Sequence, residues 1–352
     1  MSNRSNPAQN SGTKTTIAAL LVILCAIPAP SVMADGVALR PEVRQFVDDM
    51  VSRHRFNRDE LTVLLGQAQT RQDIIAAITR PAEAKPWFQY RPIFITEARI
   101  KGGVEFWNKH QDLLERAQTT YGVPPEIITA IVGVETRYGA NTGGFRVLDA
   151  LYTLGFDYPP RGKFFLGELE NFLLLSRDEK FDPLILKGSY AGAMGQPQFI
   201  PSSYRNFSVD FDADGTRDLW SNAADIIGSV GYYFYAHGWQ PDQPVISRAQ
   251  VEGEKYKDVL SSDLKPARNL ASFKENGVTI ADDIAADRSG ALLEFKIESG
   301  TEYWIGWQNF YVITRYNRSP LYAMAVHQLS QEIRTARRNS GTAAATVSNK
   351  ED

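Results

Sequence analysis

Residues 125–139 read PEIITAIVGVETRYG, a helical pattern that carries one acid on its apolar side. A proline in the first turn and a glycine at the end are typical helix boundaries. Ile127, Ile128 and Ile131 lie on one face at a period of 3.6 residues, and Glu135 continues this face at i+4 from Ile131. The stretch therefore predicts a core helix with an inward-facing carboxyl group.

An ionisable group on a buried face needs a partner or a function, since removing its charge from water is costly. Burial favours the neutral acid and raises its pKa toward the range in which it can donate a proton. Glu135 is thus a candidate general acid. The alternative is a structural ion pair, and this helix alone does not separate the two.

Helical patterns dominate the rest of the chain, with a proline-punctuated aromatic loop at 85–92. Between about 240 and 310 the segments become short, β-prone and separated by turn residues. We therefore expect a helical core with a small inserted β-containing lobe. The helical patterns cover 42–54, 59–67, 72–79, 104–120, 125–138, 165–176, 222–236 and 320–337.

The composition excludes several classes of protein. The 352 residues are 43% hydrophobic and 22% charged with a net charge of -3, which is ordinary for a globular protein and argues against a nucleic-acid partner. A single cysteine permits no intrachain disulfide, and the four scattered histidines form no zinc motif. No pattern for an organic cofactor occurs.

The first 34 residues resemble an export signal. A basic start, a short apolar run and small residues before Asp35 are typical of a secretory signal peptide, which predicts a periplasmic protein cleaved after Ala34. Cys25 opens an alternative, a lipoprotein anchored in the outer membrane. The residue before it is Leu24, where lipoprotein processing prefers a small side chain, so we favour cleavage after Ala34.

An acidic loop follows at 210–220. Asp210, Asp212, Asp214, Gly215 and Asp218 match EF-hand loop positions 1, 3, 5, 6 and 9, which suits a structural calcium ion. Thr216, at position 7, would supply a carbonyl oxygen. Position 12 is Ser221 rather than Glu, so we expect the closing carboxylate to come from Asp225. The alternative is that Asp225 forms a capping box with Asn222.

Five motifs in family order resemble those of the type B lytic murein transglycosylases. The resemblance spans roughly residues 43–329 and implies a lysozyme-like α-helical core with an additional N-terminal helical region. The motifs are Glu135-Thr136-Arg137-Tyr138-Gly139, the block 189–204, the acidic loop 210–220, the stretch 228–239, and 309–317 with Tyr322.

The resemblance implies a lyase that cleaves the β-1,4 bond between N-acetylmuramic acid and N-acetylglucosamine in peptidoglycan. Glu135 would act first as acid and then as base, with assistance from the substrate's N-acetyl group, and would leave a 1,6-anhydromuramic end. Substrate-assisted enzymes need no second catalytic carboxylate. The alternatives are a lysozyme-type hydrolase and a catalytically silent wall-binding protein.

The same resemblance implies which residues contact the substrate, one position at a time. Hydroxyls, amides and aromatic faces suit sugar rings, although core packing is the alternative for each tyrosine. Ser189 has no histidine partner motif, which argues against a serine nucleophile. Only Arg161, with Lys163 nearby, remains of the family's paired arginines, and a solvated basic turn is its alternative. The expected substrate-binding residues are Tyr90, Arg161, Ser189, Gln198, Tyr316, Asn317 and Tyr322.

We therefore divide the chain into six segments. Expected partners are peptidoglycan glycan strands and proteins of cell-wall synthesis, with the outer membrane only if Cys25 is lipidated. The segments are a signal peptide (1–34), an N-terminal helical region (35–120), a catalytic core (121–239), a β-containing lobe (240–308), the C-terminal part of the core (309–338) and a disordered tail (339–352).

Overall fold

The computed structural model describes residues 39–80 and 85–348, with side chains through residue 340. The predicted signal peptide and Cys25 lie outside the described residues. Helices make up most of the described chain, which confirms the mainly α-helical prediction. Within this part of the chain, no helix combines the length and apolar character needed to cross a membrane.

Three short helices, α1 (Pro41–His54), α2 (Arg58–Gly66) and α3 (Gln72–Ile78), begin the described chain. They are fastened to α8 (Val147–Asp157) and α9 (Gly162–Asp178) by polar contacts. His54 on α1 contacts Glu170 on α9 at 2.7 Å, and the backbone amides of Gln69 and Arg71 donate to the side chains of Asp149 and Thr153. These contacts join regions about 80–120 residues apart in the sequence.

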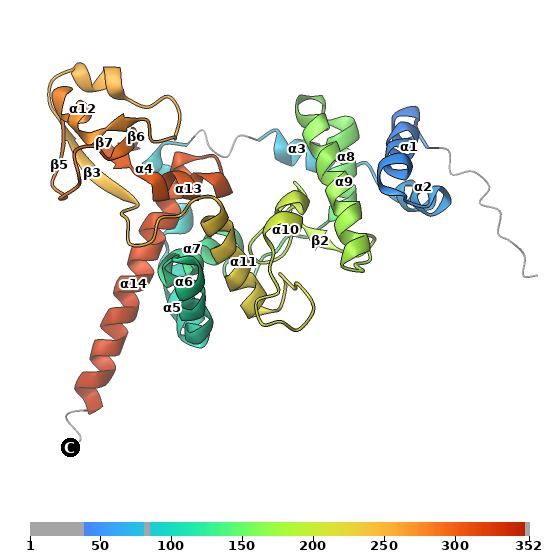
Figure 1. Ribbon diagram of the computed structural model, residues 1–352, viewed down its shortest axis with the longest axis horizontal. Helices are drawn as coiled ribbons and strands as arrows, with labels where there is room; N and C mark the ends of the chain where they lie inside the picture. The colour runs from blue at the N-terminus through green and yellow to red at the C-terminus, as the bar shows by residue number, and fades with distance from the viewer. Residues whose placement is uncertain (1–38, 81–84, 349–352) are drawn as a thin grey trace, which may run out of the picture. The chain divides into compact units, whose positions relative to one another are not determined.

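The helix predicted from the opening stretch is α7 (Pro125–Thr136), and it forms the centre of the core. All but two of its twelve residues are buried, because the helix is apolar on every side. Helices α5 (Glu97–Lys109) and α14 (Pro320–Ser348) pack against it and against each other, and α6 (Gln111–Tyr121) and α11 (Ala223–Ala236) also contact it (Figure 1). This packing fixes the position of Glu135.

Two predictions of local structure were wrong. The expected aromatic loop at 85–92 forms α4 (Trp87–Phe94), which tolerates an internal Pro92 because burial of Trp87 and Tyr90 offsets the lost hydrogen bond. The single helix expected at 104–120 is two helices separated at His110. Helix α5 packs on α7 and α14, whereas α6 packs mainly on α11, so tertiary packing outweighs the continuous pattern.

The predicted β lobe is a five-stranded antiparallel sheet in the order β4-β6-β7-β3-β5. It has its own apolar cluster, which includes Phe273 and Trp307. Trp87 on α4 packs edge-on against Phe295 of the sheet at 5.7 Å, so the lobe supports the helix that carries Tyr90. The strands are β3 (Ile246–Val251), β4 (Arg268–Asn269), β5 (Val278–Ile280), β6 (Ser289–Ile297) and β7 (Gly300–Gly306).

The last helix is longer than the pattern predicts. Helix α14 continues through Ser348, so residues 339–348, expected to be disordered, have a helical backbone. Residues 349–352 lie outside the described residues. The remaining helices are α10 (Pro201–Phe207), α12 (Leu270–Glu275) and α13 (Gln308–Tyr316).

A short antiparallel pair, β1 (Phe145–Arg146) with β2 (Lys187–Gly188), leads directly into Ser189. Gly143 approaches this pair with a positive φ of 97°, and a β-carbon placed on it would lie 2.1 Å from the carbonyl oxygen of Gly188. Only glycine fits this position, because other residues would meet both a backbone clash and an unfavourable φ.

We therefore expect Gly143→Ala to lower the free energy of unfolding by about 2–4 kcal/mol, the sum of overpacking and a strained φ. Gly144→Ala is the matched control, since a β-carbon there meets nothing within 4 Å. Chemical denaturation of both variants measures the difference. Equal stabilities would show that the close approach of Gly143 to Gly188 is not a constraint on the fold.

Candidate active site

Glu135 lies in the last turn of α7 and is partly buried. Burial raises the pKa of its carboxyl to about 7, although a hydrogen bond from Tyr322 acts in the opposite direction. The Tyr322 hydroxyl donates to Oε1 of Glu135 over 2.5 Å. This carboxyl can therefore hold a proton near neutral pH and release it to a nearby base.

One of the tyrosines predicted from the family motifs, Tyr322, contacts this carboxyl, and a second, Tyr316, stacks on Tyr322. Tyr322 lies in the first turn of α14, and its ring stacks on Tyr316, at the end of α13, with 6.5 Å between centroids. The Tyr316 hydroxyl donates to the carbonyl of Pro197 over 2.6 Å. Burial and the charge of Glu135 raise the pKa of both phenols well above the usual value, so both remain neutral donors. Tyr90 from α4 is buried, and its interaction with Tyr322 adds to the rise of the Tyr322 pKa.

Ser189 and Gln198 stabilise the loop in which they lie. The Ser189 hydroxyl oxygen accepts from the backbone N–H groups of Ala191 and Ala193, at 3.3 and 3.0 Å. Gln198 adopts a positive φ of 52°, and its Nε2 donates to the carbonyls of Thr142 and Gly195 at 3.1 and 2.9 Å. Neither the Ser189 proton nor Gln198 Oε1 has a hydrogen-bond partner among the described residues, so both could contact a ligand.

The structure does not bring Arg161 or Asn317 into contact with Glu135. Arg161 is exposed, and its guanidinium lies over the rings of Phe164 and Phe165 at 4.4 and 5.1 Å. Asn317 is exposed at the C-terminal end of α13. Arg161 therefore fits the alternative of a solvated basic turn, and the expected substrate contacts of Arg161 and Asn317 stay predictions.

Two residues that the sequence reasoning missed hold the end of α7. The buried Thr136 hydroxyl donates to the carbonyl of Gln196 over 2.9 Å and accepts from the N–H of Gly139 at 3.1 Å. Gln196 in turn donates from its backbone N–H to Leu219 and from Nε2 to Trp220, at 2.7 and 2.9 Å. The only available signal was that Thr136 directly follows Glu135 in the motif.

The acidic loop brings three carboxylates together. Asp210, Asp212 and Asp214 each place an oxygen within 4.8 Å of the others, as expected of ligands for a hard cation. Two Thr216 groups, the backbone N–H and the hydroxyl, both donate to Asp214 Oδ1, at 2.8 and 2.7 Å. Three like charges this close favour a bound cation, because they would otherwise repel one another.

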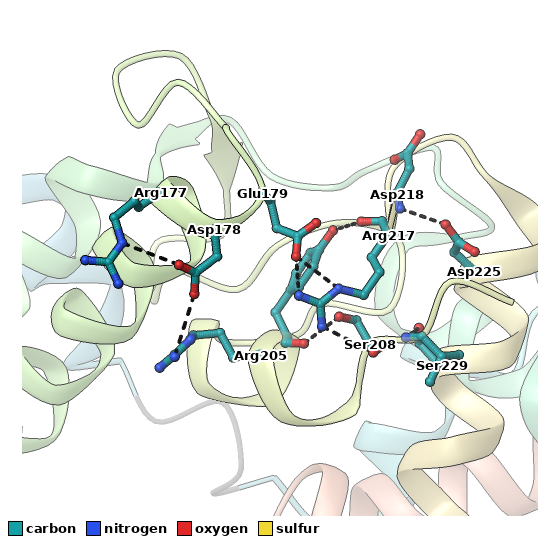
Figure 2. Close-up of polar contacts among 11 residues, drawn as sticks. Arg177, Asp178, Glu179, Arg205, Ser208, Arg217, Asp218, Asp225 and Ser229 are labelled. Atoms are coloured by element: carbon teal, nitrogen blue, oxygen red, sulfur yellow. Dashed lines mark hydrogen bonds and ion pairs between the residues drawn. The ribbon is translucent and has the colours of Figure 1, made fainter. Parts of the chain in front are cut away.

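Asp225 lies outside the cluster and has a different partner set. Its carboxylate is buried and accepts from the backbone N–H groups of Phe211 and Asp218, each at 2.8 Å. Figure 2 shows the contact with Asp218. Asn222 caps α11 by accepting from the N–H groups of Ala224 and Asp225, but the Asp225 carboxylate does not accept from Asn222, so only one half of the expected capping box is present among the described residues. Asp225 therefore ties both ends of the loop to α11, while its expected role as a closing metal ligand stays a prediction.

A second polar network joins the loop to α9. Arg217 pairs with Glu179, just beyond the end of α9, while Arg205 on α10 approaches Asp178 at 3.9 Å (Figure 2). The Ser229 hydroxyl oxygen accepts from the N–H of Val209 at 2.9 Å. The acidic loop is thus fixed to α9, α11 and, through Gln196, the end of α7.

Comparison with known proteins identifies the family of this chain. The chain matches the family model described as transglycosylase SLT domain over residues 38–331. It is 44% identical over 317 residues to membrane-bound lytic murein transglycosylase B of Escherichia coli (strain K12), covering 87% of this chain and 86% of that protein.

Solved structures give the same result and confirm the predicted fold class. Soluble lytic transglycosylase SltB1 from Pseudomonas aeruginosa is 50% identical with a TM-score of 0.80, covering 84% of this chain and 99% of that one. Escherichia coli lytic transglycosylase Slt35, solved in complex with calcium, is 45% identical with a TM-score of 0.78, covering 85% and 95%. The chain therefore belongs to the transglycosylase SLT domain family.

Proposed function

We propose that this protein is a lytic transglycosylase that cleaves the β-1,4 bond between N-acetylmuramic acid and N-acetylglucosamine in peptidoglycan without consuming water. The observation that carries this proposal is the partly buried Glu135, whose pKa is raised to about 7 and whose hydrogen-bond partner is a phenol. Such a group can serve as acid and base in turn.

Two acids of α9, Glu168 and Glu170, are engaged with other partners in the described chain. Glu168 accepts two hydrogen bonds from Ser202, at 2.9 and 2.7 Å, and Glu170 pairs with Arg53 and His54. Within the described chain, Tyr322 is the side chain that hydrogen-bonds to Glu135. A retaining hydrolase would need a carboxylate about 5–5.5 Å from the acid, so assistance from the substrate suits this site better.

The proposed reaction has two steps. Glu135 protonates the glycosidic oxygen, and the N-acetyl oxygen of the muramic residue bonds to C1 as the leaving sugar departs. The Glu135 carboxylate then removes the proton from the C6 hydroxyl, O6 bonds to C1, and the N-acetyl oxygen is released. The proton returns to Glu135, and the product carries a 1,6-anhydro ring with no added water.

The neighbouring residues take supporting roles in this proposal. Tyr322 fixes the direction of the Glu135 carboxyl and stabilises its ionised form between the two steps. We assign sugar contacts to Tyr90 and Tyr316 by their aromatic faces and to Ser189, Gln198 and Asn317 by their polar groups. Arg161 would meet the wall's carboxylates at the outer edge of the site.

We also propose that the acidic loop binds calcium and that export places the enzyme in the periplasm. Asp210, Asp212 and Asp214 converge as ligands for a hard cation, and the similar Slt35 was solved with calcium. Calcium bound there would neutralise the cluster and stabilise the loop that supports Gln196. No catalytic step passes through it.

The first test replaces the acid. Glu135→Gln removes the proton donor and should lower cleavage of purified sacculi by at least about 10³-fold while glycan binding persists. The products of the unaltered enzyme, analysed by mass spectrometry, should lack one water relative to reducing ends. Products with reducing ends would instead identify a lysozyme-type hydrolase, and no cleavage by the unaltered enzyme would identify a wall-binding protein.

Stability provides the folding control for this variant. A carboxyl whose pKa is raised on folding destabilises the protein once it ionises, so the penalty appears above pH 4.5 and is complete above about pH 7. Glu135→Gln should therefore be more stable than the unaltered protein at pH 8, by up to about 3 kcal/mol, with the difference vanishing near pH 4. A less stable variant at pH 8 would show that Glu135 is ion-paired rather than desolvated.

The pH profile tests the raised pKa. The protonated acid must start the reaction, so kcat/KM should fall as the pH rises through about 7. Tyr322→Phe removes a hydrogen bond that favours the ionised carboxyl and should move this fall to higher pH. Tyr316→Phe is the matched control, since its hydroxyl donates to Pro197 and its loss should leave the midpoint in place. Equal shifts in both variants would contradict this assignment.

The calcium assignment is tested by thermal denaturation. Calcium at 100-fold its dissociation constant should stabilise the folded protein by about 2.7 kcal/mol relative to the chelator-treated protein. Asp212→Asn should abolish this stabilisation, whereas Asp282→Asn, an exposed aspartate outside the cluster, should retain it. Unchanged stabilisation in Asp212→Asn would place the ion elsewhere.

A further inference from the structure

Four aromatic rings meet on one side of α11, where α6 packs beside it (Figure 1). Tyr232 and Tyr235 lie one turn apart on α11 and stack on each other, with 6.3 Å between ring centroids and 27° between ring planes. Tyr121, the last residue of α6, lies 5.9 and 6.0 Å from these two rings and 5.8 Å from Phe211 of the acidic loop. We call these four rings the α11 aromatic surface.

Two glycines of α11 allow two of these rings to rest against the helix backbone. A β-carbon placed on Gly231 would lie 2.7 Å from the Tyr121 ring, and one placed on Gly228 would lie 2.5 Å from the side chain of Phe211. Glycine inside a helix is unfavourable, so this close approach costs helix stability. Rings that are fixed before a ligand arrives lose little conformational entropy when it binds.

The α11 aromatic surface and the candidate active site lie on different sides of α11. Tyr233 packs toward the active site, because its ring lies 4.8 Å from that of Tyr316 and its hydroxyl donates to the carbonyl of Arg315 over 2.7 Å. Successive residues of a helix point about 100° apart, so Tyr232 leaves the helix in another direction. In the described part of the chain, neither Tyr232 nor Tyr235 makes a ring contact with Tyr316.

The hydroxyl groups of the α11 aromatic surface are open to a ligand. Among the described residues, the hydroxyls of Tyr121, Tyr232 and Tyr235 have no hydrogen-bond partner. Tyr235 is 56% exposed, and the hydroxyls of the half-buried Tyr121 and Tyr232 are not enclosed by protein. Burial and the neighbouring Tyr232 raise the pKa of Tyr121, so its phenol stays neutral and can both donate and accept.

Little charge accompanies these rings. The guanidinium of Arg116 lies over the Phe211 ring at 3.9 Å, and its Nη2 donates to the Phe211 carbonyl over 2.5 Å. The carboxylates of Asp210 and Asp212, on either side of Phe211, converge with each other in the acidic cluster. Flat rings with unpaired hydroxyls therefore fit a neutral ligand that has both apolar faces and hydroxyl groups, and a pyranose ring has this combination.

A protein partner suits the α11 aromatic surface less well. A stable protein interface needs about 800 Å² on each partner, with a centre of several apolar side chains. The exposed large hydrophobic residues of the described chain lie on separate segments, and only Tyr235 belongs to this surface. Four rings present a much smaller area, which matches a few sugar units.

We propose that the α11 aromatic surface binds a β-1,4-linked, N-acetylated glycan at a position apart from the site of cleavage. Tyr232 and Tyr235 would contact the apolar faces of successive sugars, and the hydroxyls of these tyrosines and of Tyr121 would bond to sugar hydroxyl and acetamido groups. That the glycan is a peptidoglycan strand rests on the proposed function. Binding there would hold the enzyme on the wall and leave Glu135 free to act.

Fluorine NMR of the full chain carrying 3-fluorotyrosine tests this surface directly. Chitotetraose, an uncharged oligomer of N-acetylglucosamine without peptide, should shift the resonances of Tyr232 and Tyr235 saturably, and the two single Tyr→Phe variants assign these resonances. Tyr235→Ala should weaken the binding seen at Tyr232 by about 3- to 10-fold through loss of one stacking contact. Ile185→Ala, which removes another exposed side chain (68%), is the matched control and should bind like the unaltered protein. Tyrosine resonances that do not move, or equal affinity in the two variants, would overturn the proposal.

Co-sedimentation with sacculi extends the test to the proposed substrate. Tyr235→Ala should bind sacculi stripped of peptide by an amidase about 3- to 10-fold more weakly, while kcat/KM for a short soluble glycan fragment stays unchanged. Loss of both would place Tyr235 in the catalytic cleft and overturn a separate surface. Because the NMR titration needs no cleavage, its result stands even if the proposed lyase activity fails. An active enzyme whose tyrosine resonances do not respond would keep the proposed function and lose only this surface.

Discussion

The desolvation of one carboxyl group governs the organisation of this protein. Glu135 ends a helix that is buried almost along its whole length, so its charged form is removed from much of the water that would stabilise it. The Tyr322 hydroxyl limits this penalty without introducing an opposite charge. A cation in the same place would have fixed the carboxyl in its ionised form, and the proton near neutral pH would be lost.

Much of the surrounding structure keeps Glu135 and Tyr322 within hydrogen-bonding distance of each other. Glu135 and Tyr322 are 187 residues apart, so their hydrogen bond depends on the packing of α14 against α7. Thr136 and Gln196 fix the other side of the helix end and connect it to the segment that leaves the acidic loop. The acidic loop therefore influences the position of Glu135 through hydrogen bonds rather than through its charge.

The sequence predicted those features that follow from local periodicity. The apolar stripe of α7 identified both the core helix and its inward-facing acid, and the aspartate spacing identified the cluster at 210–214. The pattern at 85–92 failed because two prolines there suggested a loop, while burial of Trp87 and Tyr90 stabilised a helix. A local sequence pattern does not show which residues, distant in the sequence, a side chain will pack against.

The same limit explains what was missed in the site. Motif resemblance placed Tyr322 near the acid, but no spacing shows that its hydroxyl contacts Oε1. Asp225 was expected to supply the closing carboxylate that Ser221 lacks, and its oxygens accept from backbone N–H groups at either end of the loop. The role of Asp225 depends on backbone N–H groups, which nearly every residue type has, so the sequence alone cannot reveal it.

The left-handed turn after α7 separates two environments along three residues. Arg137 and Tyr138 adopt positive φ angles of 52° and 60°, which end the helix directly after Glu135 and Thr136. A continued helix would place the residue at 139 above Glu135 and cover the acid, since i and i+4 share a face. The turn instead leaves Glu135 facing Tyr322 and directs Arg137 and Tyr138 to a pocket beside α5. Both positive φ angles carry a conformational cost. A cation beside Glu135 would lower the pKa of its carboxyl, whereas in the described chain the side chain that hydrogen-bonds to it is the neutral Tyr322.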